Sequence, residues 1–92
     1  MRQKFVVGNW KLNGSLPGNE SLLRAILKEV SPQPGRHLAV CVPAPYLAQV
    51  RALLEGSPIG WGGQDVSRFG KGAYTGEVSG AMLRELGATF SI

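Results

Sequence analysis

Residues 5–14 read FVVGNWKLNG, a short apolar run that ends abruptly in polar side chains. Its first three residues are apolar without polar alternation, which is typical of a strand buried on both faces of a parallel sheet. Asn9 and Lys11 then follow two residues apart. On an extended backbone this spacing places both side chains on one face. We therefore predict a buried strand over residues 5–7 that ends in an amide and an ammonium lying side by side.

An amide beside an ammonium suits a small anionic ligand rich in oxygen, such as a phosphorylated sugar. Asn9 offers a donor and an acceptor, and Lys11 offers three donors and a positive charge. The alternative is that Lys11 is a solvated lysine after an edge strand and Asn9 a turn residue, since both types are common in loops. The spacing alone leaves both interpretations open.

The composition bounds the class of protein. The chain has 92 residues, enough for one small domain, and its apolar share of 43% is that of a globular protein. No apolar run approaches the about 20 residues of a transmembrane helix, and no signal-peptide core follows the first basic residues. The net charge of +4 comes from basic residues scattered singly, so neither a nucleic-acid surface nor a membrane is expected as partner. Cys41 is the only cysteine, which fits a reducing, cytoplasmic location.

Farther along the chain, helical periodicity alternates with continuous apolar runs. Strands are predicted over residues 37–42, 59–64 and 88–92. Helices are predicted from Asn19, or an earlier Ser or Pro, to about residue 30, from 46 to 55, and from 79 to 86. Their inward-facing residues are predicted to be Leu22, Leu23, Ile26, Leu27, Val30, Tyr46, Leu47, Val50, Leu53, Leu54, Met82, Leu83 and Leu86. This order indicates an α/β fold with parallel strands and right-handed crossovers.

Two single residues are assigned to structure rather than to chemistry. Cys41 lies within an apolar strand, where a cysteine is usually a small core residue. His37 is the only histidine and stands at the entry end of its strand, opposite the end where α/β sites form. We therefore expect His37 at the surface and Cys41 in the core.

The loop over residues 65–78 is far longer than the usual two to six residues of a strand-to-helix connection. Its length and its aromatic residue Tyr74 favour an interaction loop over an ordinary surface loop with turn glycines.

Residues 8–14, GNWKLNG, closely resemble the opening motif of triosephosphate isomerases. A second resemblance to that family lies in residues 64–67, QDVS, and residues 72–79, GAYTGEVS. The resemblance implies a TIM (β/α)8 barrel, of which residues 1–92 supply the first half, β-α-β-α-β-α-β, in a single domain. A Rossmann-type half is the rival from patterning alone, but its glycine-rich phosphate fingerprint is missing after the first strand.

The resemblance also implies a function. The family interconverts dihydroxyacetone phosphate and D-glyceraldehyde 3-phosphate by proton transfer, in glycolysis and gluconeogenesis, without a metal or other cofactor. Lys11 matches the catalytic lysine that offsets substrate charge, and Asn9 matches the asparagine that binds and orients the substrate. The long loop would insert beside the active site of the other subunit of a homodimer, with Thr75 at its tip and Tyr74 and Glu77 beside it.

The family mechanism also needs a histidine, a glutamate base and a lid loop, and none of these matches a position in this sequence. His37 and Glu77 do not stand at the motif positions. The isolated 92-residue chain is therefore expected to be inactive. A second interpretation is a non-catalytic half-barrel module that self-associates through exposed sheet edges.

Overall fold

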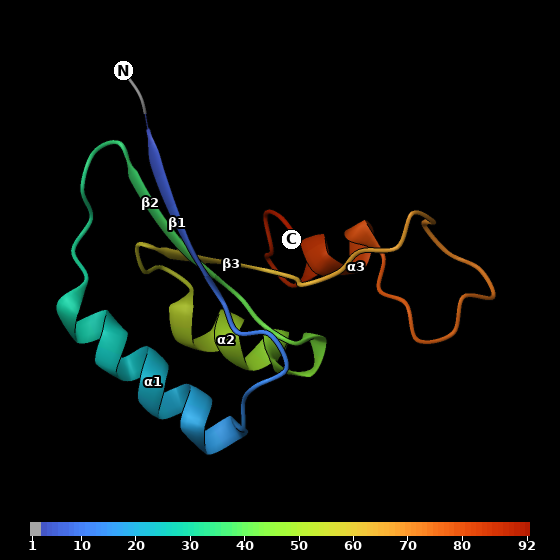
Figure 1. Ribbon diagram of the computed structural model, residues 1–92, viewed down its shortest axis with the longest axis horizontal. Helices are drawn as coiled ribbons and strands as arrows, with labels where there is room; N and C mark the ends of the chain where they lie inside the picture. Colours follow the sequence, from blue (N-terminus) through green and yellow to red (C-terminus); the bar gives the residue numbers. More distant parts are fainter. Residues whose placement is uncertain (1–2) are drawn as a thin grey trace.

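The computed structural model describes residues 3–92, and these form a parallel three-stranded sheet with helices between the strands (Figure 1). The strands are β1 (Lys4–Asn9), β2 (Arg36–Cys41) and β3 (Ile59–Gly62), in the spatial order β1-β2-β3. The helices are α1 (Leu16–Glu29), the short 3₁₀ helix η1 (Ala44–Tyr46), α2 (Leu47–Leu54) and α3 (Gly80–Glu85). The predicted fold class, α/β with parallel strands, is confirmed. Residues 1 and 2 of the predicted domain lie outside the described residues.

The register of the sheet brings its carboxyl-terminal strand ends together. Asn9 of β1 lies opposite Cys41 of β2, and Cys41 lies opposite Gly62 of β3. Side chains that follow these three strands therefore meet at one edge of the sheet, which is where ligands bind in α/β proteins.

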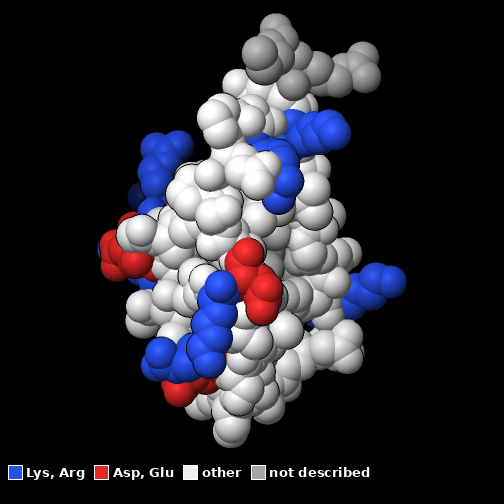
Figure 2. Space-filling view, turned by 90° about the vertical axis from the view of Figure 1, so that its left-hand side faces the viewer, with Lys and Arg blue, Asp and Glu red and all other residues white. Residues whose placement is uncertain are grey.

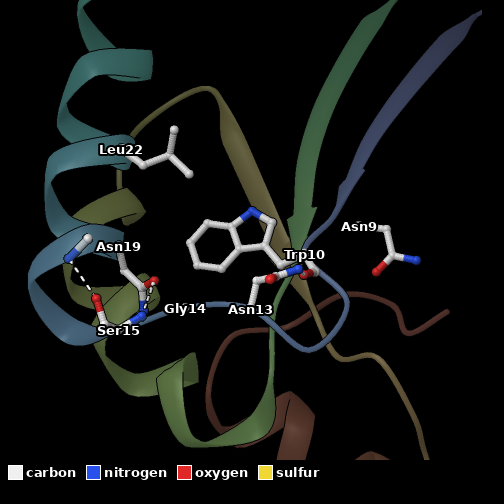
Figure 3. A pocket seen from close by; sticks show the side chains of 8 residues that line it. Asn9, Trp10, Asn13, Gly14, Ser15, Asn19 and Leu22 are labelled. Carbon is white, nitrogen blue, oxygen red and sulfur yellow. Dashed lines mark hydrogen bonds between the residues drawn. The ribbon is translucent and has the colours of Figure 1, made fainter.

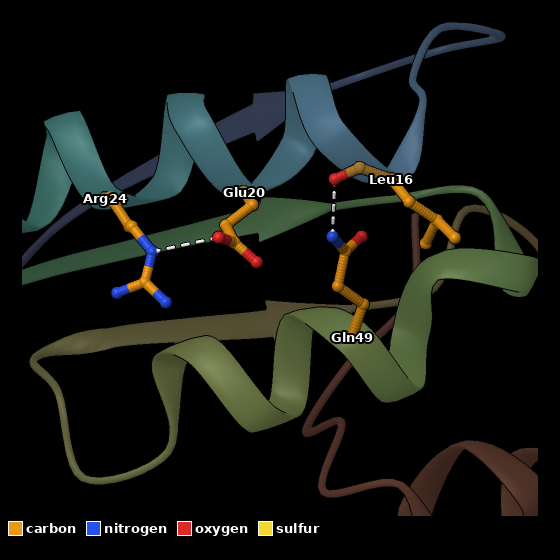
Figure 4. A network of polar contacts seen from close by, with 4 residues as sticks. All are labelled: Leu16, Glu20, Arg24 and Gln49. Carbon is orange, nitrogen blue, oxygen red and sulfur yellow. Dashed lines mark hydrogen bonds and ion pairs between the residues drawn. The ribbon is translucent and has the colours of Figure 1, made fainter.

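Helix α1 begins earlier than Asn19, the first start considered from the sequence. Ser15 is its N-cap, and the Ser15 hydroxyl accepts a hydrogen bond from the Gly18 amide at 3.1 Å. Pro17 sits in the first helical turn, where a missing N–H costs nothing. The alternative start at an earlier Ser or Pro is therefore confirmed. The predicted i,i+4 pair on the wet face, Glu20 with Arg24, is present at 3.3 Å (Figure 4).

The core lies between the helices and the face of the sheet that they cover. Helix α2 packs against β3, and α1 packs against α2. The buried apolar residues of this cluster are Leu23, Val40, Val42, Leu47, Val50, Leu54, Ile59, Leu83 and Ala88. Leu22 and Met82, which were predicted to face inward, are instead 47% and 52% exposed. The packed side of α1 centres on Leu23, and the short α3 buries only Leu83.

Strand β1 is not buried as predicted. Phe5, Val6 and Val7 are 58%, 56% and 38% exposed. The physical reason is that β1 pairs only with β2, while the main helix packing of the described residues lies between α2 and β3 and between α1 and α2. A continuous apolar run thus predicts a strand, but the burial of that strand depends on which strands and helices pack beside it.

Residues 88–92 run parallel to β3 but form only one bridge, between Gly63 and Ser91, instead of the predicted fourth strand. The Gly63 amide donates to the Phe90 carbonyl, and the Ile92 amide donates to the Gly63 carbonyl, both at 3.1 Å. The backbones approach so closely that a Cβ on Gly62 would lie 2.5 Å from the Phe90 carbonyl oxygen. This close approach accounts for a glycine inside β3.

Candidate functional site

Lys11 has a backbone conformation that only glycine adopts without cost. Its φ is +55°, and it is the only non-glycine residue with positive φ among residues 3–92. This left-handed conformation costs an L-residue roughly 1–2 kcal/mol. The extended spacing assumed for Asn9 and Lys11 was therefore wrong, because β1 ends at Asn9 and the chain turns at Lys11.

Hydrogen bonds hold both backbone polar groups of Lys11. The Asn9 side-chain oxygen accepts from the Lys11 amide at 2.9 Å. The Lys11 carbonyl accepts from the Nε2 group of Gln64 at 2.8 Å. A strained residue persists only where its surroundings fix it, and such residues cluster at functional sites. The structure thus brings Asn9, Lys11 and Gln64 together at the carboxyl edge of the sheet.

Successive side chains leave opposite sides of the β1 end (Figure 3). The Trp10 indole points toward α1, whereas the Asn9 side chain lies on the other side of the chain. An open cavity of about 590 Å³ lies on the Trp10 side, lined also by Asn13, Asn19 and Leu22. Asn9 also lines this cavity, whereas Lys11 does not, so the cavity borders the predicted Asn9–Lys11 site but contains only one of its two residues.

The Lys11 ammonium is exposed and has no acidic partner among residues 3–92. The ion pairs in this part of the chain join Glu20 to Arg24 and Arg51 to Glu55. Basic side chains are otherwise spread singly, and the face turned toward the viewer in Figure 2 shows acidic groups between them. The positive charge at the end of β1 is therefore available to an anionic ligand.

Comparison with known protein families identifies the family of this chain. A sequence model described as triosephosphate isomerase matches residues 4–92. The chain belongs to the triosephosphate isomerase family. Its fold class is therefore that of the TIM barrel, as the motifs over residues 8–14 and 64–79 implied.

Individual triosephosphate isomerases match the chain along its whole length. The sequence is 54% identical over 92 residues to the triosephosphate isomerase of Cupriavidus pinatubonensis and 52% identical over 92 residues to that of Thiobacillus denitrificans. It is 55% identical over 93 residues to the triosephosphate isomerase of Delftia acidovorans. Each match covers 100% of this chain but only 36–37% of the relative. The chain thus corresponds to a little over a third of a family member.

The long loop, which carries the second family motif, has an ordered base and an exposed tip. The Ser67 amide donates to the Val78 carbonyl at 2.7 Å and closes the base. The Glu77 amide donates to the Tyr74 carbonyl at 3.0 Å, which forms a turn around the exposed Thr75. The loop projects away from the sheet in Figure 1. The loop is therefore ordered at its base and protrudes from the rest of the chain.

An aromatic stack stiffens the loop. The rings of Phe69 and Tyr74 lie 4.0 Å apart and within 4° of parallel. The Arg68 guanidinium lies 5.0 Å from the centre of the Phe69 ring. Tyr74 is 40% exposed, so its aromatic ring remains partly accessible to solvent within the stack. The sequence analysis singled out Tyr74 but missed Phe69, whose only signal is an aromatic residue among the turn glycines.

His37 and Cys41 lie where the sequence placed them. His37 is exposed, and its Nε2 atom is 2.7 Å from the Oε1 atom of Gln3. Cys41 is 0% exposed, and burial raises the pKa of its thiol. No group of three or more potential metal ligands occurs within residues 3–92. The same residues contain no helix both long and apolar enough to span a bilayer.

The raised pKa of Cys41 predicts a loss of stability in alkaline solution. Above the ordinary thiol pKa, the unfolded chain loses the thiol proton while the folded chain keeps it, so the free energy of unfolding falls as the pH rises. The slope is at most about 1.4 kcal/mol per pH unit for one group. The protein for this test is a hybrid, in which residues 1–92 replace the matching segment of the Cupriavidus pinatubonensis relative.

Urea unfolding of this hybrid and of its Cys41→Ala variant, at about pH 7 and about pH 9.5, measures the effect on either side of the thiol pKa. We expect the free energy of unfolding to fall more for the hybrid than for the variant. Equal losses in the two proteins would contradict the prediction.

Proposed function

We propose that the protein carrying this chain is a triosephosphate isomerase, with residues 1–92 as the N-terminal half of a single barrel domain. It would interconvert dihydroxyacetone phosphate and D-glyceraldehyde 3-phosphate in glycolysis and gluconeogenesis. The observation that carries the proposal is the left-handed Lys11, held at the carboxyl end of β1 in a chain of this family. The single buried cysteine, Cys41, supports a cytoplasmic location.

The chemistry assigned to Lys11 follows from charge. Removing a proton next to a carbonyl group places negative charge on the carbonyl oxygen, and the substrate phosphate is negative already. A fixed ammonium beside these oxygens stabilises the transition state more than it would in water. Lys11 is therefore proposed as the catalytic cation of the site.

Asn9 is proposed to bind and orient the substrate with its amide nitrogen. Its side-chain oxygen already accepts from the Lys11 amide at 2.9 Å. The two N–H groups of the Asn9 side chain have no hydrogen-bond acceptor within residues 3–92, so they are free to donate to a substrate oxygen. Asn9 would thus serve both the conformation of Lys11 and the ligand.

The hybrid tests the proposed function directly. We expect it to turn over D-glyceraldehyde 3-phosphate within about tenfold of the parent enzyme, because a site that keeps its geometry keeps its rate. The isolated 92-residue chain is expected to show no measurable turnover, because no carboxylate base accompanies Lys11 in it. A coupled spectrophotometric assay measures both proteins.

Two outcomes would contradict this prediction. A folded hybrid without turnover would contradict the proposed function. Turnover by the pure 92-residue chain would show that the site needs no further base.

The exposed strand β1 favours a second candidate function, a non-catalytic module that self-associates. Phe5 and Val6 are 58% and 56% exposed on a strand that pairs on one side only. Exposed apolar edges recruit further strands. An inactive hybrid together with a stable homo-oligomer of the isolated chain would favour this module over the isomerase.

We further propose that the loop over residues 65–78 joins two copies of the protein in a homodimer. Its ordered base, its aromatic stack and the exposed tip at Thr75 support this role, with Tyr74 and Glu77 on either side of the tip. A preformed loop loses less conformational entropy on binding, which favours association.

A further inference from the structure

Gln64, just beyond the end of β3, reaches both neighbouring strand ends with one side-chain nitrogen. Its Nε2 group donates to the Lys11 carbonyl at 2.8 Å and to the Cys41 carbonyl at 3.2 Å. A primary amide nitrogen has two hydrogens, so each carbonyl receives its own donor. Gln64 therefore connects the turn after β1 to the last residue of β2.

The Lys11 carbonyl needs such a donor. In its left-handed conformation Lys11 has left the ladder between β1 and β2, which ends at Asn9. Within residues 3–92, no backbone N–H outside the helices and strands donates to the Lys11 carbonyl. The Gln64 side chain takes the place that a ladder partner would fill.

The two bonds on Lys11 have different reach along the chain. Asn9 holds the amide side from two residues away, a local contact that any turn can make. Gln64 holds the carbonyl side from 53 residues away, so it fixes the turn relative to the rest of the sheet. The Trp10 amide ties the chain before the turn to the Cys41 carbonyl at 3.0 Å, and the Gln64 contact adds the bond that holds Lys11 itself against the other strand ends.

We propose that Gln64 is a positioning residue, which keeps Lys11 in its left-handed conformation and so places the ammonium for the substrate anion. The inference rests on the proposed function, since it assigns Lys11 a substrate. Glutamine suits the role because it provides two donors on one atom. Glutamate would place an oxygen against two carbonyl oxygens, and asparagine is one methylene group shorter.

The test is the substitution Gln64→Glu in the hybrid, with Gln49→Glu as the matched control. Gln49 makes the same kind of bond elsewhere, since its Nε2 group donates to the Leu16 carbonyl at 2.7 Å between α2 and α1 (Figure 4). Both substitutions remove a donor from a backbone carbonyl, but only one of them acts next to Lys11.

We expect Gln64→Glu to lower kcat/KM about ten- to a hundredfold, because a displacement of about 1 Å at a reacting group has effects of this size. The inhibition constant of inorganic phosphate, a probe for the anion site, should rise in parallel. Gln49→Glu should lower the melting temperature and leave kcat/KM within about twofold, since its contact stabilises helix packing alone.

A crystal structure of the Gln64→Glu hybrid gives a readout that does not depend on activity. We expect the φ of Lys11 to leave the left-handed region. An unchanged φ would overturn the proposal, and so would a changed φ with kcat/KM within twofold of the unsubstituted hybrid. A hybrid without turnover would remove the proposed function, and the φ of Lys11 alone would then decide whether Gln64 holds the turn.

Discussion

Replacing Lys11 with alanine in the hybrid is expected to lower kcat/KM by about three orders of magnitude. A preorganised group that stabilises developing negative charge contributes about 3–4 kcal/mol to the transition state, and a full charge acts at the upper end of this range. Among residues 3–92, the Lys11 ammonium at the carboxyl edge of the sheet has no acidic partner. Steady-state kinetics with D-glyceraldehyde 3-phosphate measures the loss.

Two further variants separate charge from backbone strain. Glycine adopts the left-handed conformation without cost, so Lys11→Gly removes the ammonium and relieves the strain. The Lys11→Gly hybrid should be as inactive as the Lys11→Ala hybrid. It should unfold at a higher urea concentration than the Lys11→Ala hybrid. Lys28→Ala, which removes an exposed lysine from the last turn of α1, serves as the control and should keep full activity. A Lys11→Ala hybrid within tenfold of the unsubstituted rate would leave Lys11 as part of the scaffold.

Replacing Thr75 with arginine is expected to weaken the association of two hybrid molecules by about a hundredfold or more. A long charged side chain at the tip of a docking loop would be buried without a partner, which costs several kcal/mol. The turn around Thr75 and the stack of Phe69 on Tyr74 would remain, because neither uses the Thr75 side chain. Sedimentation equilibrium over a range of concentrations measures the dissociation constant.

The matched control places the same arginine elsewhere. Ala25 is exposed on α1, so Ala25→Arg adds the same charge away from the loop. It should leave the dissociation constant unchanged. Unaltered association of the Thr75→Arg hybrid would show that residues 65–78 lie outside the interface.

Local signals in the sequence were sufficient for the start of α3 and for the ends of α2 and α3. Ser79 caps α3 by accepting from the Met82 amide at 3.2 Å, which is the usual role of a serine hydroxyl at a helix start. Gly56 and Gly87 end their helices with φ values of +82° and +80°, which glycine alone adopts freely. Each of these features depends on residues within one turn, so the chain specifies it without reference to the rest of the fold.

Features that depend on distant residues could not be predicted from the sequence. The left-handed turn at Lys11 requires a donor from Gln64, which the sequence analysis placed only at the end of a strand. The exposure of Phe5 and Met82 is set by which elements pack beside them, and apolar character alone does not say this. The residue types of the candidate site were thus predictable, whereas its conformation was not.

The parallel pairing of the sheet has a consequence for how the chain is made. Lys4 pairs with Arg36 and Leu38 pairs with Ile59, so every pairing joins residues more than twenty positions apart. No hairpin can nucleate such a sheet, and each pairing must first close a long loop. On the ribosome, β1 therefore emerges without a partner and waits until β2 has been synthesised. An unpaired apolar strand of this kind favours aggregation, so the time between the synthesis of β1 and that of β2 is a vulnerable stage in folding.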